Sequence, residues 1–457
     1  MFNICLFFLF FAASIVGHAQ SSEPLMSHKP DGSRVVRRSR VDANFGFTEL
    51  TFMNGVQIIL KPTDFENDKI QFAGFSPGGK SLYLDEDFMS ATVAANIVKM
   101  SGLGAFDHAA LNQKLEDNTA RLSPYISEIY EGVNGWAEPD DLETLLQLNY
   151  LYFTAARRDE EAFNNLISQM RSQAANMRAN PLEAYLDTLN MVVASNSPRV
   201  VTIPARSQIN RIRLNHALNI YNDRFSDAGD FKFVMVGNFN VDAVIPLLET
   251  YLGGLPSRRR IETWRDVTPQ FPSGVRVVRY PQKPEENSRV DFIMKGAFRW
   301  NIRERLHFEI FIELMKTKLR ETMHEAIDDD FSIEVSGIVK RYPNPQYSLE
   351  ITLNCAPENT DSLIDILFDE VFKLKENGPT VADLNAVKEK IISERETAME
   401  GNEFWKKALL NTYREGDKPV TLQDFKKSVN SVRPRDIRAI ARQYFNETNY
   451  VQGILSN

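Results

Sequence analysis

The chain has 457 residues, of which 43% are hydrophobic and 25% are charged, and its formal net charge is −8. This composition is typical of an ordinary globular protein and excludes a fibrous or disordered chain. The acidic balance also argues against a nucleic-acid-binding protein, which would carry a basic surface.

Residues 1–19 have the pattern of a signal peptide. An apolar run from Ile4 to Val16 precedes the small residues before Gln20, where cleavage is expected. The run is shorter than the roughly 20 residues of a membrane-spanning helix, and no later segment is more apolar. We therefore expect an exported protein, periplasmic or extracellular, with no membrane span. Removal of the leader leaves Cys355 as the only cysteine, in an apolar context that favours a buried, inert thiol, so no disulfide framework can form.

Strand signals come first in the mature chain. Residues 48–62 alternate around Asn54-Gly55, which predicts a β-hairpin, and residues 69–75 predict another strand. Helical periodicity then predicts a helix that starts near Asp85 and ends at Gly102. Further helices are expected at 140–156, 159–179, 182–194 and 211–225, then a strand at 231–236 and a helix at 241–252.

The second part of the chain repeats the first with an offset of about 220 residues. The strand around residues 70–72 matches 290–292, and the helix around 162–166 matches 383–387. The chain also ends in phase, with a helix at 435–445 and a strand at 450–455 that echo those at 211–225 and 231–236. The pattern indicates α/β (α+β) architecture with two homologous mixed α/β domains.

Domain boundaries follow from composition. We expect a linker at 20–44, a first α/β repeat at 45–254, a linker at 255–274 and a second repeat at 275–457. The basic runs at 34–40 and 258–260 fall in or beside these linkers, and we interpret them as solvated charge, with partner binding as the alternative.

Several segments in fixed order carry a family resemblance. They are residues 50–56 with 61–63, 76–81, 221–225, 233–239 and 252–256, and residues 402–405 after a long helix. Together they resemble the insulinase/pitrilysin family of zinc metallopeptidases, the last segment being similar to its bacterial, periplasmic branch. The resemblance implies a half-unit of two α/β domains, and two such half-units close like a clamshell around an extended peptide.

The catalytic motif of that family is absent. Active half-units carry H-x-x-E-H on a first-domain helix, in which two imidazoles hold zinc and the Glu takes a proton from zinc-bound water, with a distal Glu as third ligand. In the register that the resemblance implies, Ala95 and Lys99 occupy the histidine positions, Val98 the base position and Gln173 the distal one. No two of the six histidines lie within five residues of each other, so the motif is absent in any register.

A second conserved feature of active members also differs here. An Arg and a Tyr seven residues apart in the second domain reach the substrate in those members, around two glycines. The resemblance places His324 and Phe331 at the Arg and Tyr positions, with Asp328-Asp329 in place of the glycines. A Phe cannot donate the phenolic hydrogen bond to an oxyanion. Phe331 is therefore either the first core residue of a strand at 331–339 or a residual peptide contact.

The sequence thus predicts a half-unit without catalytic, cofactor-binding or metal residues of its own, with zinc held only by its partner. That partner would be a zinc-bearing homologous half-unit, or a second copy in a homodimer, and the enclosed ligand an extended peptide. One alternative is a stand-alone exported peptide-binding or chaperone-like protein that holds peptides by strand addition. Another is an autonomous zinc endopeptidase with unconventional ligands.

Overall fold

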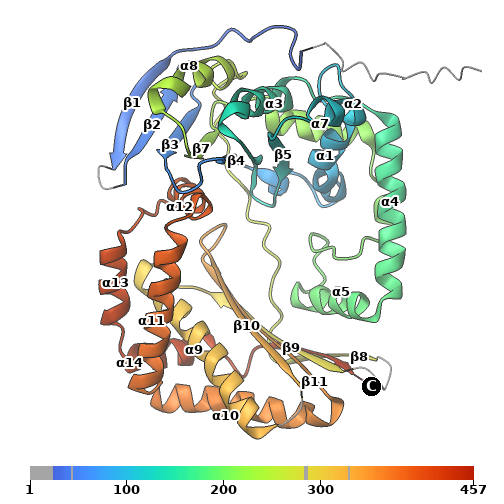
Figure 1. Cartoon of the computed structure of the whole chain (residues 1–457). Coiled ribbons are helices and arrows are strands. Elements are labelled where there is room, and N and C mark those ends of the chain that lie inside the picture. Colours follow the sequence, from blue (N-terminus) through green and yellow to red (C-terminus); the bar gives the residue numbers. More distant parts are fainter. Residues whose placement is uncertain (1–23, 43–44, 282–286, 328–329, 457) are drawn as a thin grey trace, which may run out of the picture.

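The computed structural model describes residues 24–42, 45–281, 287–327 and 330–456, so the predicted signal peptide at 1–19 lies outside the described residues. The chain forms two halves, each built on one β-sheet, which Figure 1 shows one above the other. No helix in the described ranges is long and apolar enough to cross a membrane.

The first half holds a seven-stranded sheet in the order β1-β2-β3-β7-β4-β6-β5. Its strands are β1 (Val35–Asp42), β2 (Phe47–Phe52), β3 (Gln57–Pro62), β4 (Ile70–Pro77), β5 (Arg121–Ile126), β6 (Tyr130–Ala137) and β7 (Lys232–Gly237). Its α-helices are α1 (Phe88–Ser101), α2 (His108–Lys114), α3 (Leu142–Thr154), α4 (Glu160–Ala179), α5 (Pro181–Val193), α6 (Arg206–Ile209), α7 (Leu214–Phe225) and α8 (Val241–Tyr251). Short 3-10 helices η1 (Gly79–Leu82) and η2 (Pro139–Asp141) precede α1 and α3.

The second half holds a five-stranded sheet in the order β10-β11-β9-β12-β8. Its strands are β8 (Arg276–Pro281), β9 (Ser288–Ala297), β10 (Ser332–Lys340), β11 (Gln346–Cys355) and β12 (Val451–Ser456). Its helices are α9 (Ile302–Ala326), η3 (Pro357–Asn359), α10 (Thr360–Asn377), α11 (Val381–Ala398), α12 (Asn402–Glu415), α13 (Leu422–Ser431) and α14 (Pro434–Tyr444).

The two sheets have the same topology. Reading the second sheet from β8 to β10 gives the order of β3 to β5 in the first, with one parallel pair, β3·β7 or β8·β12, and otherwise antiparallel pairs. β1 and β2 have no counterpart in the second sheet. The fold class predicted from the sequence is confirmed.

Local signals explain where the elements begin and end. Gly55 has a positive φ of 98° in the β2–β3 turn, and Gly102, with φ 80°, ends α1. Asn180 accepts hydrogen bonds from the backbone N–H groups of Leu182 and Glu183 and so caps α5, whose first residue is Pro181. Each cap uses a residue type that the sequence shows plainly.

The expected linker at 20–44 was partly wrong. Residues 35–42 form β1, which pairs antiparallel with β2 and is the edge strand of the first sheet. Its arginines are therefore strand residues; Arg38, for example, pairs with Asp242 of α8 at 2.6 Å. Positive charge on an edge strand discourages pairing with other chains.

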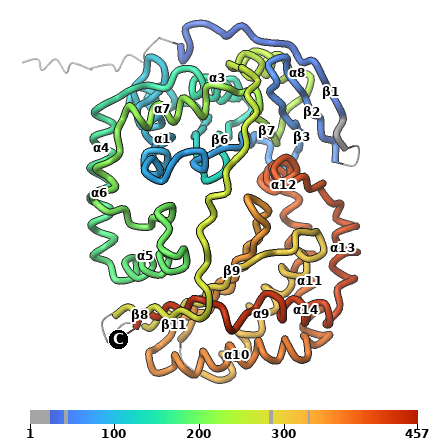
Figure 2. Tube along the Cα trace, turned by 180° about the vertical axis from the view of Figure 1, so that it is seen from behind, coloured from blue at the N-terminus to red at the C-terminus, as the bar shows by residue number. Residues whose placement is uncertain are grey.

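The second basic run, residues 258–260, holds the segment that connects the two halves against the first half. Arg259 donates a hydrogen bond to the backbone carbonyl of Met53 at 2.8 Å, and Arg260 forms an ion pair with Asp223 at 2.9 Å. The chain after α8 then crosses to the second half in an extended conformation (Figure 2).

The halves exchange one helix each. α12 belongs to the second half in sequence, but it packs on the face of the first sheet that is turned toward the second half, where Trp405, Leu409 and Leu410 meet strand residues of β2, β3, β4 and β7 (Figure 1). Conversely, α5 follows α4 across to the second sheet, where Tyr185, Leu189 and Val193 pack on β8, β9 and β12 (Figure 1). Residues 181 and 402, which start these helices, differ by the repeat offset, so the exchange is reciprocal.

Polar contacts fix both exchanged helices. Asn402 is fully buried; its side-chain amide donates to the Lys69 carbonyl at 3.2 Å, and its Oδ1 accepts a hydrogen bond from Thr63 at 2.6 Å. At the other junction, the hydroxyl of Tyr185 donates to buried Asp291 at 2.6 Å. Residues 402–405 thus anchor α12 to the first sheet.

Candidate functional site

The zinc-motif positions lie on α1, as the sequence predicts. α1 packs against α7 and the edge strand β5. Ala95 is 6% exposed and Val98 is completely buried, whereas Lys99 is exposed. The aliphatic side chains of Ala95 and Val98 have no atom that ligates a metal or accepts a proton, and a charged ammonium at Lys99 has no lone pair to offer. In this register two of the three positions therefore belong to the hydrophobic core.

The distal position lies on the neighbouring helix. Gln173 is an exposed residue of α4, and α4 packs beside α1. A neutral amide at this place lacks the negative charge that a carboxylate ligand brings to zinc.

The histidines are dispersed over the described part of the chain. Nδ1 of His108 lies 3.2 Å from the Lys99 carbonyl oxygen, and Nε2 of His216 lies 2.8 Å from Asp87. Within the described ranges no three His, Cys, Asp or Glu side chains gather as a metal-binding group.

A cavity of about 500 Å³ lies between α2 and α4, next to the end of α1. His108, Asp107, Asp159 and Glu161 line it. Asp107 and Asp159 each accept a hydrogen bond from a backbone N–H as the N-cap of α2 or α4. These two carboxylates thus have a structural role at helix starts.

The structure brings together the two positions singled out in the second half. His324 lies near the end of α9, Phe331 directly precedes β10, and their ring centroids are 4.6 Å apart. His324 is exposed and Phe331 half-buried, so this pair of tilted rings borders the surface at the edge strand β10. Asp328-Asp329, at the predicted glycine positions, lie outside the described residues.

Each sheet presents an edge strand next to these positions. β5 is the last strand of the first sheet and packs against α1, and β10 is the last strand of the second sheet. Edge strands carry backbone N–H and C=O groups that an extended peptide can pair with.

A buried charge network was not found from the sequence. Arg224 and Glu131 are 2% and 1% exposed and lie 3.6 Å apart, and Arg224 also pairs with Glu262 at 2.8 Å and with Asp223 at 2.6 Å. Glu131 accepts a hydrogen bond from the backbone N–H of Gly79 at 2.6 Å. The network fastens the inter-half connection, through Glu262, to the glycine turn before α1.

Burial dominates the electrostatics of this network. It raises the pKa of Glu131 to about 8, against the opposing attraction of Arg224 and the hydrogen bond from Gly79. Two of the family-like segments, 76–81 and 221–225, contribute Gly79 and Arg224. The family resemblance of these two segments was the sequence signal that could have pointed to the network. Glu131 itself lies in β6, a strand that was not predicted.

Comparisons with known proteins agree with these features. Residues 211–391 match the family model described as Peptidase M16 inactive domain. A zinc protease PQQL-like protein of Arabidopsis thaliana is 25% identical over 408 residues, which are 86% of this chain and 40% of that protein.

Solved structures share the fold over almost the whole chain. The periplasmic protease PqqL from Escherichia coli superposes with a TM-score of 0.80 at 19% identity, covering 95% of this chain and 48% of that one. A protease from Helicobacter pylori superposes with a TM-score of 0.73 at 13% identity, covering 94% of this chain and 100% of that one. The chain thus spans less than half the length of these PqqL relatives, and its match covers the whole of the Helicobacter pylori chain. Residues 211–391 thus match the M16 inactive-domain model, and the whole chain is similar to PqqL-type zinc proteases and has the fold of one M16 half-unit.

Proposed function

We propose that this chain is a non-catalytic half-unit that pairs with a zinc-bearing homologous half-unit and helps to enclose an extended peptide for degradation. The observation that carries the proposal is the fold: the chain superposes on one half of the PqqL protease, with a TM-score of 0.80. The described residues thus form one half of a two-half architecture, and the proposal pairs this half with a second, zinc-bearing half.

The residues at the motif positions support a non-catalytic role. Ala95, Val98, Lys99 and Gln173 provide neither the three zinc ligands nor the general base of the family mechanism. Zinc would therefore be held by the partner alone. The PqqL relative from Escherichia coli is described as periplasmic, which supports the same compartment for this chain when it is considered with the predicted signal peptide.

The proposal is tested by reconstitution with an exported homologue that carries an intact H-x-x-E-H. Light scattering should show a one-to-one complex of the two purified chains, whose interface we expect to exceed about 1,600 Å². The complex should cleave a quenched fluorescent peptide faster than the homologue alone. The matched control is a homologue whose motif Glu is changed to Gln, which should associate but not cleave. No association and no stimulation would count against the proposal.

A stand-alone peptide-binding protein is the second candidate. The free edges at β5 and β10 favour it, because each can accept an added strand. Peptide binding by the isolated, monomeric chain, without any homologue, would support this alternative. A homodimer of this chain would contain no H-x-x-E-H motif. It would therefore agree with a peptide-binding function but not with peptide cleavage.

A further inference from the structure

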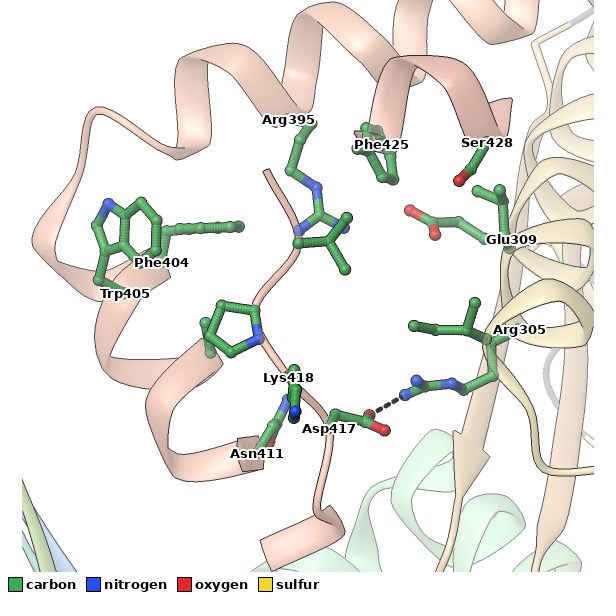
Figure 3. A pocket seen from close by; sticks show the side chains of 15 residues that line it. Arg305, Glu309, Arg395, Phe404, Trp405, Asn411, Asp417, Lys418, Phe425 and Ser428 are labelled. Atoms are coloured by element: carbon green, nitrogen blue, oxygen red, sulfur yellow. Dashed lines mark ion pairs between the residues drawn. The ribbon is translucent and has the colours of Figure 1, made fainter. Parts of the chain in front are cut away.

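A cavity of about 240 Å³ lies in the second half, away from α1 and from the His324–Phe331 pair. Parts of α9, α11, α12 and α13 enclose it, together with residues 417–420 (Figure 3). Its charged lining includes Arg305, whose guanidinium is already paired with Asp417 at 2.6 Å. Two other charged groups, Arg395 and Glu309, point into the same space (Figure 3).

Arg395 is a cation without a hydrogen-bonded partner. Its guanidinium carbon lies 4.3 Å from the ring centroid of Phe425 and 5.2 Å from that of Phe404, so aromatic rings hold it in place. Within the described part of the chain its guanidinium group forms no hydrogen bond and no ion pair within 4.0 Å. Burial lowers the pKa of Arg395, and the negative charge of Glu309 across the cavity opposes this effect only in part.

Glu309 is the complementary group. It comes from α9, opposite Arg395 on α11, and the described residues offer its carboxylate no hydrogen bond or ion pair. Two opposite charges thus share one cavity without contacting each other. A ligand that carries both an acceptor for Arg395 and an N–H donor for Glu309 would satisfy them together.

Most of the remaining lining is apolar, and Asn411, Lys418 and Ser428 are its polar members. Phe404, Trp405 and Phe425 form the wall, and Ile302 and Val420, which are 57% and 40% exposed, form the rim. An exposed apolar rim around a partly enclosed cavity is typical of a site that buries an apolar group. The volume is sufficient for one amino-acid residue, not for a long peptide.

We infer that this cavity binds an apolar α-amino acid through its free α-carboxylate, either as the C-terminal residue of a peptide or as the free amino acid. Arg395 receives the carboxylate in a bidentate contact, Glu309 accepts a hydrogen bond from the α-nitrogen, and the aromatic wall packs on the side chain. The site does not depend on the proposed partnership, because all its groups belong to this chain.

Titration calorimetry on the isolated full-length protein tests the site. N-acetyl-phenylalanine should bind about ten-fold more tightly than N-acetyl-phenylalaninamide, which lacks the charge. The substitution Arg395→Gln should abolish this preference, whereas the same change at exposed Arg320 on α9, outside the cavity, should leave it intact. Phenylalanine and the tripeptide Ala-Ala-Phe distinguish the two sources: comparable binding of both assigns a peptide terminus, and binding of phenylalanine alone assigns a free amino acid.

A second variant keeps the test decisive if Arg395→Gln does not fold. Val420→Asp places a negative charge on the exposed rim and should weaken N-acetyl-phenylalanine binding about ten-fold without disturbing the core. Equal binding of the acid and the amide, no binding of either, or unchanged binding in the folded variants would overturn the inference.

Discussion

At the residue scale, burial has opposite energetic consequences for two side chains of the first half. Val98 occupies the base position as a fully buried aliphatic residue, whereas Glu131 is a fully buried acid in a strand. Val98 adds to the hydrophobic core. The cost of burying the Glu131 carboxyl group must be offset by Arg224 and by the hydrogen bond from the Gly79 N–H.

Glu131 therefore predicts how stability depends on pH. Its pKa is about 8 in the folded protein and near 4.5 when unfolded, so the folded state binds more protons between these values. Stability should fall as pH rises from about 5 to 8, with a contribution from this group of up to about 1.4 kcal/mol per pH unit. Urea unfolding at pH 5.5, 6.5 and 7.5 should show a shallower decline for Glu131→Gln than for the wild type. Exposed Glu138, changed to Gln, is the control, and identical slopes in all three proteins would contradict the assignment.

The side chains at the zinc positions predict the metal content. Because Ala95, Val98 and Lys99 offer no ligand at pH 7, the purified protein should contain less than about 0.1 zinc per chain after dialysis against micromolar zinc. Elemental analysis gives the value, and a homologue with H-x-x-E-H treated in parallel is the positive control. One tightly held, chelator-removable zinc per chain would show that unconventional ligands form a site.

At the element scale, the sequence predicted best where periodicity is long and local. The β2–β3 hairpin, β4, β7 and helices α1, α3, α4, α5, α7, α8 and α14 fall within a few residues of the expected ranges. β1 was interpreted as a linker because its arginines hide the apolar pattern of a strand, and β5 and β6 were missed: β6 carries Gly132 and Gly135, and β5 carries Pro124.

The helix exchange could not be predicted, because a helical pattern shows which face is apolar but not which sheet will cover it. For the same reason the site was only partly predictable. The motif positions were read from the sequence, but the Arg224–Glu131 network depends on contacts between residues distant in the chain.

The exchange itself makes a prediction about α12. Leu409 is fully buried against the first sheet, so Leu409→Ala should lower the free energy of unfolding by about 2–5 kcal/mol. Lys407→Ala on the exposed side of the same helix should change it by less than about 0.5 kcal/mol. Guanidinium unfolding measures both. A negligible effect of Leu409→Ala would mean that α12 does not hold the first sheet in solution.

At the scale of the whole molecule, the reciprocal exchange couples two halves whose cores are otherwise separate. The larger core belongs to the first half and the second core to the second half, and among the described residues only the clusters around α12 and α5 combine side chains from both halves. Unfolding either half removes a helix that covers the sheet of the other, exposing apolar surface there.

The chain should therefore unfold as one cooperative unit. Hydrogen exchange at increasing urea concentration, read by mass spectrometry, should show β3 and β4 losing protection at the same midpoint as β9 and β11. Leu409→Ala should shift both midpoints together, although Leu409 contacts only the first sheet, and Leu189→Ala in α5 should do the same from the opposite side. If either substitution moved only the sheet that it touches, the halves would unfold independently. The exchanged helices would then connect the two domains without making them one folding unit.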